Sequence, residues 1–162
     1  MTTWSQLAGS EPAFATAVQA IFDAHKHKTL ATLRKDGSPR ISGIEATFAD
    51  GELWLGMMPD SRKALDLRRD PRLALHSASV DPPEGDPSSW PGDAKLAGRA
   101  VELADEAERD AWLRAHGAPP GPGHVFRVDI AEVTLTRVGD PADHLVIEFW
   151  RDGEGLRSVK RT

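Results

Sequence analysis

Residues 29–55 read TLATLRKDGSPRISGIEATFADGELWL and contain three runs of strand-forming residues separated by two turn sequences. The runs are Thr29 to Leu33, Arg40 to Phe48 and Glu52 to Leu55, and the turns centre on Asp36-Gly37 and Asp50-Gly51. Asp-Gly favours tight hairpins because glycine reaches the positive φ angles that such turns need. The stretch therefore predicts an antiparallel meander.

The rest of the chain adds hairpin-like strands and short helices rather than repeated β-α-β units. Apolar residues occupy even-numbered positions from Phe126 to Ile130 and odd-numbered positions from Val133 to Leu135. This change of the inward-facing set predicts a β-bulge near Ala131-Glu132. Strand patterns cover residues 73–77, 95–103, 125–138 and 145–151, and helical patterns cover residues 11–25, 61–69 and 105–116. About seven strands and three short helices predict a mainly β protein, an antiparallel barrel forming one domain over residues 1–162.

The composition is that of an ordinary globular chain with a slight acidic balance. Of 162 residues, 40% are hydrophobic and 28% are charged, and the net charge is -5, which excludes a strongly basic nucleic-acid binder. No apolar run approaches the roughly 20 residues of a membrane span, and Met1 to Ser10 lacks a signal-peptide pattern. We expect a cytoplasmic protein without nucleic-acid or membrane partners. The absence of cysteine excludes disulfides and thiolate ligands, and we expect no metal site.

The segment Ser61-Arg62-Lys63 opens a predicted helix directly after the third strand. A helix N-terminus presents unpaired N–H groups and a partial positive charge, so it attracts anions. Two cationic side chains beside it complete the chemistry of a phosphate site. An ordinary capped surface helix with solvated basic residues is the simpler alternative.

The order of several short segments resembles the pyridoxamine 5'-phosphate oxidase-like family, the flavin- and deazaflavin-dependent split-barrel oxidoreductases. The resemblance is strongest from His27 to His76, and it implies an antiparallel split β-barrel. The segments that carry it are Leu30-Ala31-Thr32-Leu33, Asp36-Gly37-Ser38-Pro39-Arg40, Asp50-Gly51-Glu52-Leu53-Trp54, Ser61-Arg62-Lys63-Ala64 and Asp70-Pro71-Arg72-Leu73-Ala74-Leu75.

The resemblance also implies a cofactor site. It assigns the cofactor phosphate to Arg40, Arg62 and Lys63, with Ser61 at the same helix start, and it places Lys95 on a strand bordering the pocket. The flat ring system is expected along two strands, against Ile41, Ser42, Gly43, Gly56 and Met57. Because relatives build such sites between two subunits, we expect a homodimer.

The expected function is an oxidoreductase that transfers a hydride to or from a small conjugated or quinone-like substrate. No catalytic side chain is assigned, because a flavin carries the hydride itself. Residues Glu148 to Arg157 do not reproduce the substrate-binding segment of a true pyridoxamine-phosphate oxidase. A non-catalytic carrier of flavin, deazaflavin or haem is the alternative, and a barrel used only for interactions is a third.

Two features of the site stay open at this point. The cofactor is FMN or the deazaflavin coenzyme F-420, whose acidic tail needs further cations, for which Lys26, Lys28 and Arg34 are candidates. Glu45 would repel a second anionic group of a ligand, unless its side chain simply faces solvent.

The proline-rich segment from Asp81 to Asp93, which carries Trp90, is expected near the site and mobile without ligand.

Overall fold

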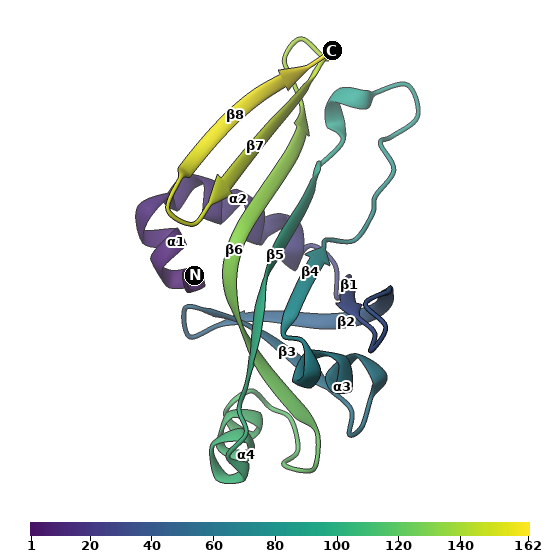
Figure 1. Ribbon diagram of the computed structural model, residues 1–162. Coiled ribbons are helices and arrows are strands. Elements are labelled where there is room, and N and C mark those ends of the chain that lie inside the picture. The colour runs from purple at the N-terminus through teal and green to yellow at the C-terminus, as the bar shows by residue number, and fades with distance from the viewer.

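A computed structural model describes residues 1–162 and shows an antiparallel sheet of eight strands, six of which close into a barrel (Figure 1). The strand order is β3-β2-β1-β4-β5-β6-β7-β8, and a second pairing of β3 with β6 closes the barrel. The strands are β1 His27–Leu33, β2 Pro39–Ala49, β3 Glu52–Met57, β4 Arg72–His76, β5 Asp93–Glu102, β6 His124–Val138, β7 Leu145–Arg151 and β8 Gly155–Arg161.

The predicted meander of residues 29–55 is confirmed as β1, β2 and β3. Asp50 and Gly51 have φ angles of 53° and 75°, the left-handed conformation expected for that turn. Alternate residues of β1 point inward, so Leu30 and Thr32 are buried with Lys28. This alternation decides which side chains of the meander reach solvent.

Four α-helices cover the barrel, one more than the sequence predicts. They are α1 Trp4–Ser10, α2 Pro12–Asp23, α3 Arg62–Arg69 and α4 Glu106–Ala115, with a single 3-10 turn η1 at Pro87–Ser89. The unpredicted α1 has only seven residues, too few to show a helical repeat, but a Thr3–Gln6 capping box and buried Trp4 and Leu7 stabilise it. No helix is both long enough and apolar enough to cross a membrane.

The predicted β-bulge is confirmed at Ala131. Ala97 of β5 pairs with Glu132, and the next residue, Gly98, pairs with Ile130, so Ala131 has no partner. A Cβ at Gly98 would lie 2.1 Å from the Asp129 carbonyl oxygen, so only glycine fits where the strands approach. The bulge adds local twist where the sheet curls into the barrel.

The last strand, β8, was not predicted because its residues beyond Leu156 are exposed and show no apolar alternation. It pairs with β7 along its whole length, and the two strands form a hairpin beyond the barrel (Figure 1). The proline-rich segment lies beside this end, opposite α3 and α4, and is held by a 2.7 Å bond from Trp90 Nε1 to Val80 O. Within one chain the segment therefore lies away from the start of α3, and both its expected position near the site and its mobility stay predictions.

Candidate functional site

A cleft of about 980 Å³ lies on the outer face of β2 and β3, between these strands and α4. The strands supply its floor, the start of α3 closes one end, and α4 with the loop after it forms the opposite wall. Its lining residues are His27, Gly43, Ile44, Glu45, Thr47, Trp54, Gly56, Met57, Met58, Ser61, Lys63, Trp112, Leu113, His116, Ala118 and Pro119.

The floor of the cleft has two positions without side chains. Gly43 on β2 and Gly56 on β3 are both exposed, and a Cβ added to either would meet nothing within 4 Å. Both backbones have φ angles outside the left-handed region, so neither glycine is required by conformation. Their effect is to leave the outer face bare, where a flat molecule can approach the main chain.

The α3 end of the cleft has the chemistry of an anion site. Ser61 is the N-cap of α3, but its side chain makes no capping bond, and its Oγ is buried without a partner. Lys63, two residues further on, lines the cleft and donates from Nζ to Gly43 O at 2.5 Å. Burial lowers the pKa of Lys63, because no carboxylate compensates its charge. An anion placed here would satisfy the serine hydroxyl and the ammonium together.

The opposite wall is aromatic and comes from residues that are distant in the chain. The Trp54 and Trp112 rings lie 5.1 Å apart, and Trp112 stacks on His116 at 4.1 Å. His116 is oriented by Trp112 O, 2.8 Å from Nδ1, and by Asp50, 3.3 Å from Nε2. The indole Nε1 of Trp112 is buried without a partner. Only the spacing of Trp112 and His116 on one helix face, four residues apart, could have indicated this wall from sequence.

Glu45 lies on the rim of the cleft, where its charge is partly compensated. Its carboxylate is 3.1 Å from Lys26 Nζ and 3.8 Å from His27 Nε2, and its side chain is 55% exposed. It is therefore a solvent-facing strand residue that also borders the cleft.

A second hollow, of about 700 Å³, lies on the other side of the α3 start and is strongly basic. We call it the cationic hollow; its lining is Arg34, Lys35, Asp36, Arg40, Arg62, Leu65, Asp66 and Arg69. Five of these eight side chains are basic and two are acidic, so the hollow has a net positive charge.

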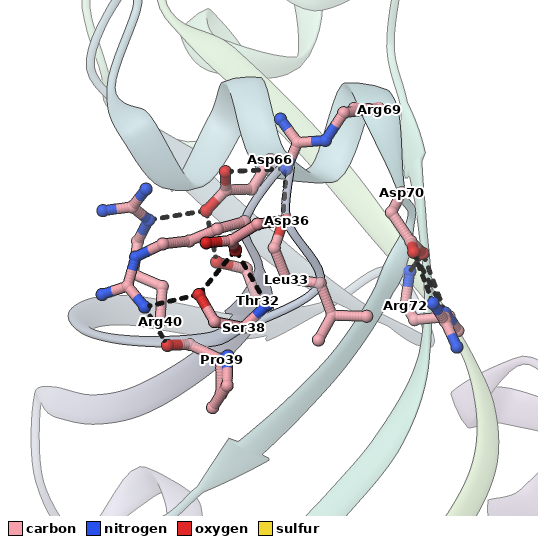
Figure 2. Close-up of polar contacts among 11 residues, drawn as sticks. Thr32, Leu33, Asp36, Ser38, Pro39, Arg40, Asp66, Arg69, Asp70 and Arg72 are labelled. Carbon is pink, nitrogen blue, oxygen red and sulfur yellow. Dashed lines mark hydrogen bonds and ion pairs between the residues drawn. The ribbon is translucent and has the colours of Figure 1, made fainter.

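Asp66 is the buried centre of the cationic hollow (Figure 2). Arg40 Nε donates to its Oδ2 at 2.6 Å, Arg69 Nη2 donates to Oδ1 at 3.0 Å, and Thr32 Oγ1 donates at 2.9 Å. Burial alone would raise the pKa of Asp66, but the three donors hold it below its ordinary value. Arg40 is thus held in place, and Asp66 compensates part of its charge, before any ligand binds.

The profile of the pyridoxamine 5'-phosphate oxidase family matches residues 14–137, more than half of the chain. The chain belongs to this family. Comparison with curated protein sequences gives no match. At the level of the family, the match supports an oxidoreductase.

Solved structures show the same fold. PhzG from Burkholderia lata, in complex with tetrahydrophenazine-1-carboxylic acid, superposes with a TM-score of 0.64 at 20% identity, over 93% of this chain and 92% of PhzG. A pyridoxamine 5'-phosphate oxidase-related, FMN-binding protein from Nostoc punctiforme gives 0.66 at 16% identity, over 98% and 99%. An F420 reductase gives 0.51 at 17% identity, over 71% of this chain and 94% of the reductase. The split-barrel fold implied by the sequence motifs is confirmed.

The residues that the family resemblance assigns to the cofactor do not all lie in one space. Five line the cleft together: Gly43, Gly56, Met57, Ser61 and Lys63. Arg40 and Arg62 line the cationic hollow instead, on the other side of α3. The remaining three, Ile41, Ser42 and Lys95, line neither space.

The three basic side chains predicted to bind an acidic cofactor tail lie in three different places. Arg34 lines the cationic hollow, and Lys26 pairs with Glu45 at the rim of the cleft. The suggestion is wrong for Lys28, which is 6% exposed and donates to Lys26 O and Ala46 O. Lys28 has the inward parity of Leu30, so its ammonium cannot reach a ligand in either space.

Proposed function

We propose that this protein is an oxidoreductase that binds FMN or the deazaflavin coenzyme F-420 and transfers a hydride to or from a small conjugated or quinone-like substrate. The observation that carries the proposal is the cleft on β2 and β3. One end has a buried, unpartnered Ser61 hydroxyl and an uncompensated Lys63 ammonium, and the floor is bare at Gly43 and Gly56. These features fit a phosphate joined to a flat ring.

The phosphate is held at the start of α3. Ser61 and Lys63 approach it from the cleft, and Arg62 with Arg40 approaches from the cationic hollow. The free N–H groups of the first helical turn add their donors and the positive end of the helix dipole. The flat ring of the cofactor covers Gly43 and Gly56, and when bound it supplies the hydride chemistry.

The substrate is held at the aromatic wall. Trp54, Trp112 and His116 present ring faces and edges that favour a planar conjugated molecule. The unpartnered indole N–H of Trp112 is a donor for a carbonyl or carboxylate of that molecule. The cleft is at the upper end of the usual volume range for small-molecule sites, large enough for a ring cofactor and a small substrate.

Both cofactors have a phosphate for the α3 site, so the choice between them depends on the part of the cofactor attached beyond the phosphate. The cationic hollow has an excess of basic residues, with Arg34, Lys35 and Arg69 in addition to the two that approach the phosphate. An oligoglutamate tail would use these charges, whereas FMN leaves them solvated. The hollow therefore favours the deazaflavin as the first cofactor to test.

The protein acts as a homodimer in this proposal. Ile41 and Met58 are 74% and 77% exposed, and Met58 borders the cleft. A second subunit over this face would cover both side chains and exclude water from the cleft. Sedimentation at micromolar concentration measures the association; a monomer that still binds cofactor tightly would contradict a site completed by two subunits.

The decisive experiment is the absorption spectrum and mass of the small molecule released from purified protein, repeated after incubation with FMN and with the deazaflavin. We expect one of them to be retained through gel filtration. The reduced complex is then mixed with quinones and other conjugated acceptors, and its reoxidation is compared with that by oxygen alone. Faster reoxidation by one acceptor class supports an enzyme, whereas equal rates support a carrier. Retention of haem, or of nothing, contradicts the proposal.

A further inference from the structure

The turn that presents Ser61 and Lys63 has an unusual backbone. It joins β3 to α3, and Asp60 in it has a φ of 54°, a left-handed conformation that is uncommon for residues other than glycine and that asparagine and aspartate adopt more readily than most. Ser61 N–H donates to Met58 O at 3.3 Å, which closes the turn from one side. The Asp60 N–H donates outside the turn, to the imidazole Nε2 of His124 at 3.2 Å. A side chain from another strand therefore holds the turn that precedes the anion site.

His124 is itself held by a chain of polar contacts that lines neither the cleft nor the cationic hollow. It lies at the start of β6, opposite Met57, and only 6% of its side chain is exposed. Its Nδ1 is 2.8 Å from Glu102 Oε1 at the end of β5. Arg68 of α3 donates to both oxygens of the same carboxylate, at 2.8 Å to Oε2 and 2.9 Å to Oε1. The chain thus runs from α3 through Glu102 and His124 back to the turn before α3.

These contacts specify one form of the imidazole. Nε2 faces an N–H donor, so it must hold a lone pair, and Nδ1 must hold the proton that goes to Glu102. Burial would raise the pKa of Glu102, but bonds from Arg68 and His124 keep it below its ordinary value. The charged groups near the ring are Glu102 from β5, Arg68 from α3 and Asp60 from the turn, and the remaining neighbour is the Phe126 ring at 6.2 Å. A proton on Nε2 would replace the acceptor by a donor and release the turn.

We propose that His124, as the neutral Nδ1–H imidazole held by Glu102 and Arg68, is a positioning residue that fixes the Asp60 turn and so places Ser61 and Lys63 for anion binding. His124 touches no ligand in this scheme. It acts only through the backbone amide of Asp60. The inference rests on the proposed function for the identity of the anion, a cofactor phosphate, but the role in the turn is independent of any ligand.

Two conservative variants separate the two bonds of the ring. In His124→Gln the terminal amide reaches the place of Nε2, so it can accept from Asp60 N–H but leaves Glu102 without its donor. In His124→Asn the shorter amide takes the place of Nδ1, so it keeps the bond to Glu102 and loses the one to Asp60. His76→Asn is the matched control, since His76 lines neither site and its ring contacts Ser77 O and Asp93, which line neither site either.

Binding is measured for two pairs of ligands that differ in the phosphate: FMN against riboflavin, and the deazaflavin coenzyme against its phosphate-free chromophore. We expect His124→Asn to weaken binding of the phosphate-bearing member about tenfold or more, and that of the phosphate-free member by less than about twofold. His124→Gln and His76→Asn should stay within about threefold of the parent for both. Equal losses in the Asn and Gln variants, or none in either, would overturn the proposal.

The ligand-free protein gives the independent readout. Nitrogen-15 spectra of the imidazole at neutral pH should show Nε2 unprotonated and Nδ1 protonated. Hydrogen exchange at the Asp60 amide should be faster in His124→Asn than in the parent, and parent-like in His124→Gln. Failure of all cofactors to bind while these two results hold would reject the proposed function but not the role of His124. An Nε2-protonated ring, or unchanged Asp60 exchange in His124→Asn, rejects that role.

Discussion

Replacing Lys63 by alanine tests the anion site at its most defined atom. In the free protein Nζ donates to Gly43 O and no carboxylate is near enough to compensate its charge. A charge-assisted bond to a phosphate contributes about 1.5 to 3 kcal/mol, so Lys63→Ala should weaken binding of FMN or the deazaflavin by about tenfold to 150-fold. Loss of the bond to Gly43 costs about 1 kcal/mol, which relief of the desolvated charge offsets in part. The variant should therefore melt close to the ligand-free parent.

The pH dependence gives this prediction a second readout. Burial lowers the pKa of Lys63 in the free protein, and a bound phosphate would raise it again. Anion binding needs the protonated form, so affinity is fully present below the lowered pKa and is lost as the pH rises through it. The parent should lose affinity at alkaline pH, and Lys63→Ala should lose less.

Fluorescence titrations of both cofactors at several pH values measure the effect of this substitution. Lys160→Ala, an exposed lysine on β8 that lines neither space, is the matched control and should bind as the parent does. Arg62→Ala should lose affinity by a similar factor from the side of the cationic hollow. If Lys63→Ala binds both cofactors as tightly as the parent and keeps its alkaline loss, the phosphate does not lie at the start of α3.

Three further substitutions test the surroundings of the site. Asp66→Asn should lower the free energy of unfolding by about 1.5 to 3 kcal/mol at neutral pH, the size of a lost charge-assisted hydrogen bond. Because the folded pKa of Asp66 is lowered, the difference should shrink on acidification, which urea melts from pH 7 to pH 3 would reveal. Gly98→Ala places a Cβ 2.1 Å from Asp129 O and should cost about 1 to 3 kcal/mol, seen as a lower Tm by calorimetry. Trp112→Ala should raise the KM for a planar substrate about threefold to tenfold, measured by steady-state kinetics, and should leave the cofactor Kd, measured by titration, nearly unchanged. A change in the cofactor Kd alone would show that the aromatic wall is not part of the substrate site.

Local signals along the chain were sufficient for much of this protein. The Asp-Gly turns and alternating residues of 29–55 predict the meander, and the parity change near Ala131 predicts the bulge, because strand periodicity and turn geometry act within a few residues. Ser61, Lys63, Gly43 and Gly56, taken from the family resemblance, do share one cleft. Elements with weak local signals were missed: α1 is short, and β8 is polar along most of its length.

The tertiary structure alone decided how the charges and aromatic rings are shared between two spaces. Arg40 lies close to Ile41 in sequence but points to Asp66, because neighbouring strand residues face opposite sides of the sheet. Trp54 meets Trp112 only after β3 pairs with β6 and closes the barrel under α4. The contact of His124 with Asp60 depends on the same pairing. Such contacts join residues about 60 positions apart, and the free energy that forms them comes from closing and packing the whole sheet, which no local stretch of sequence encodes.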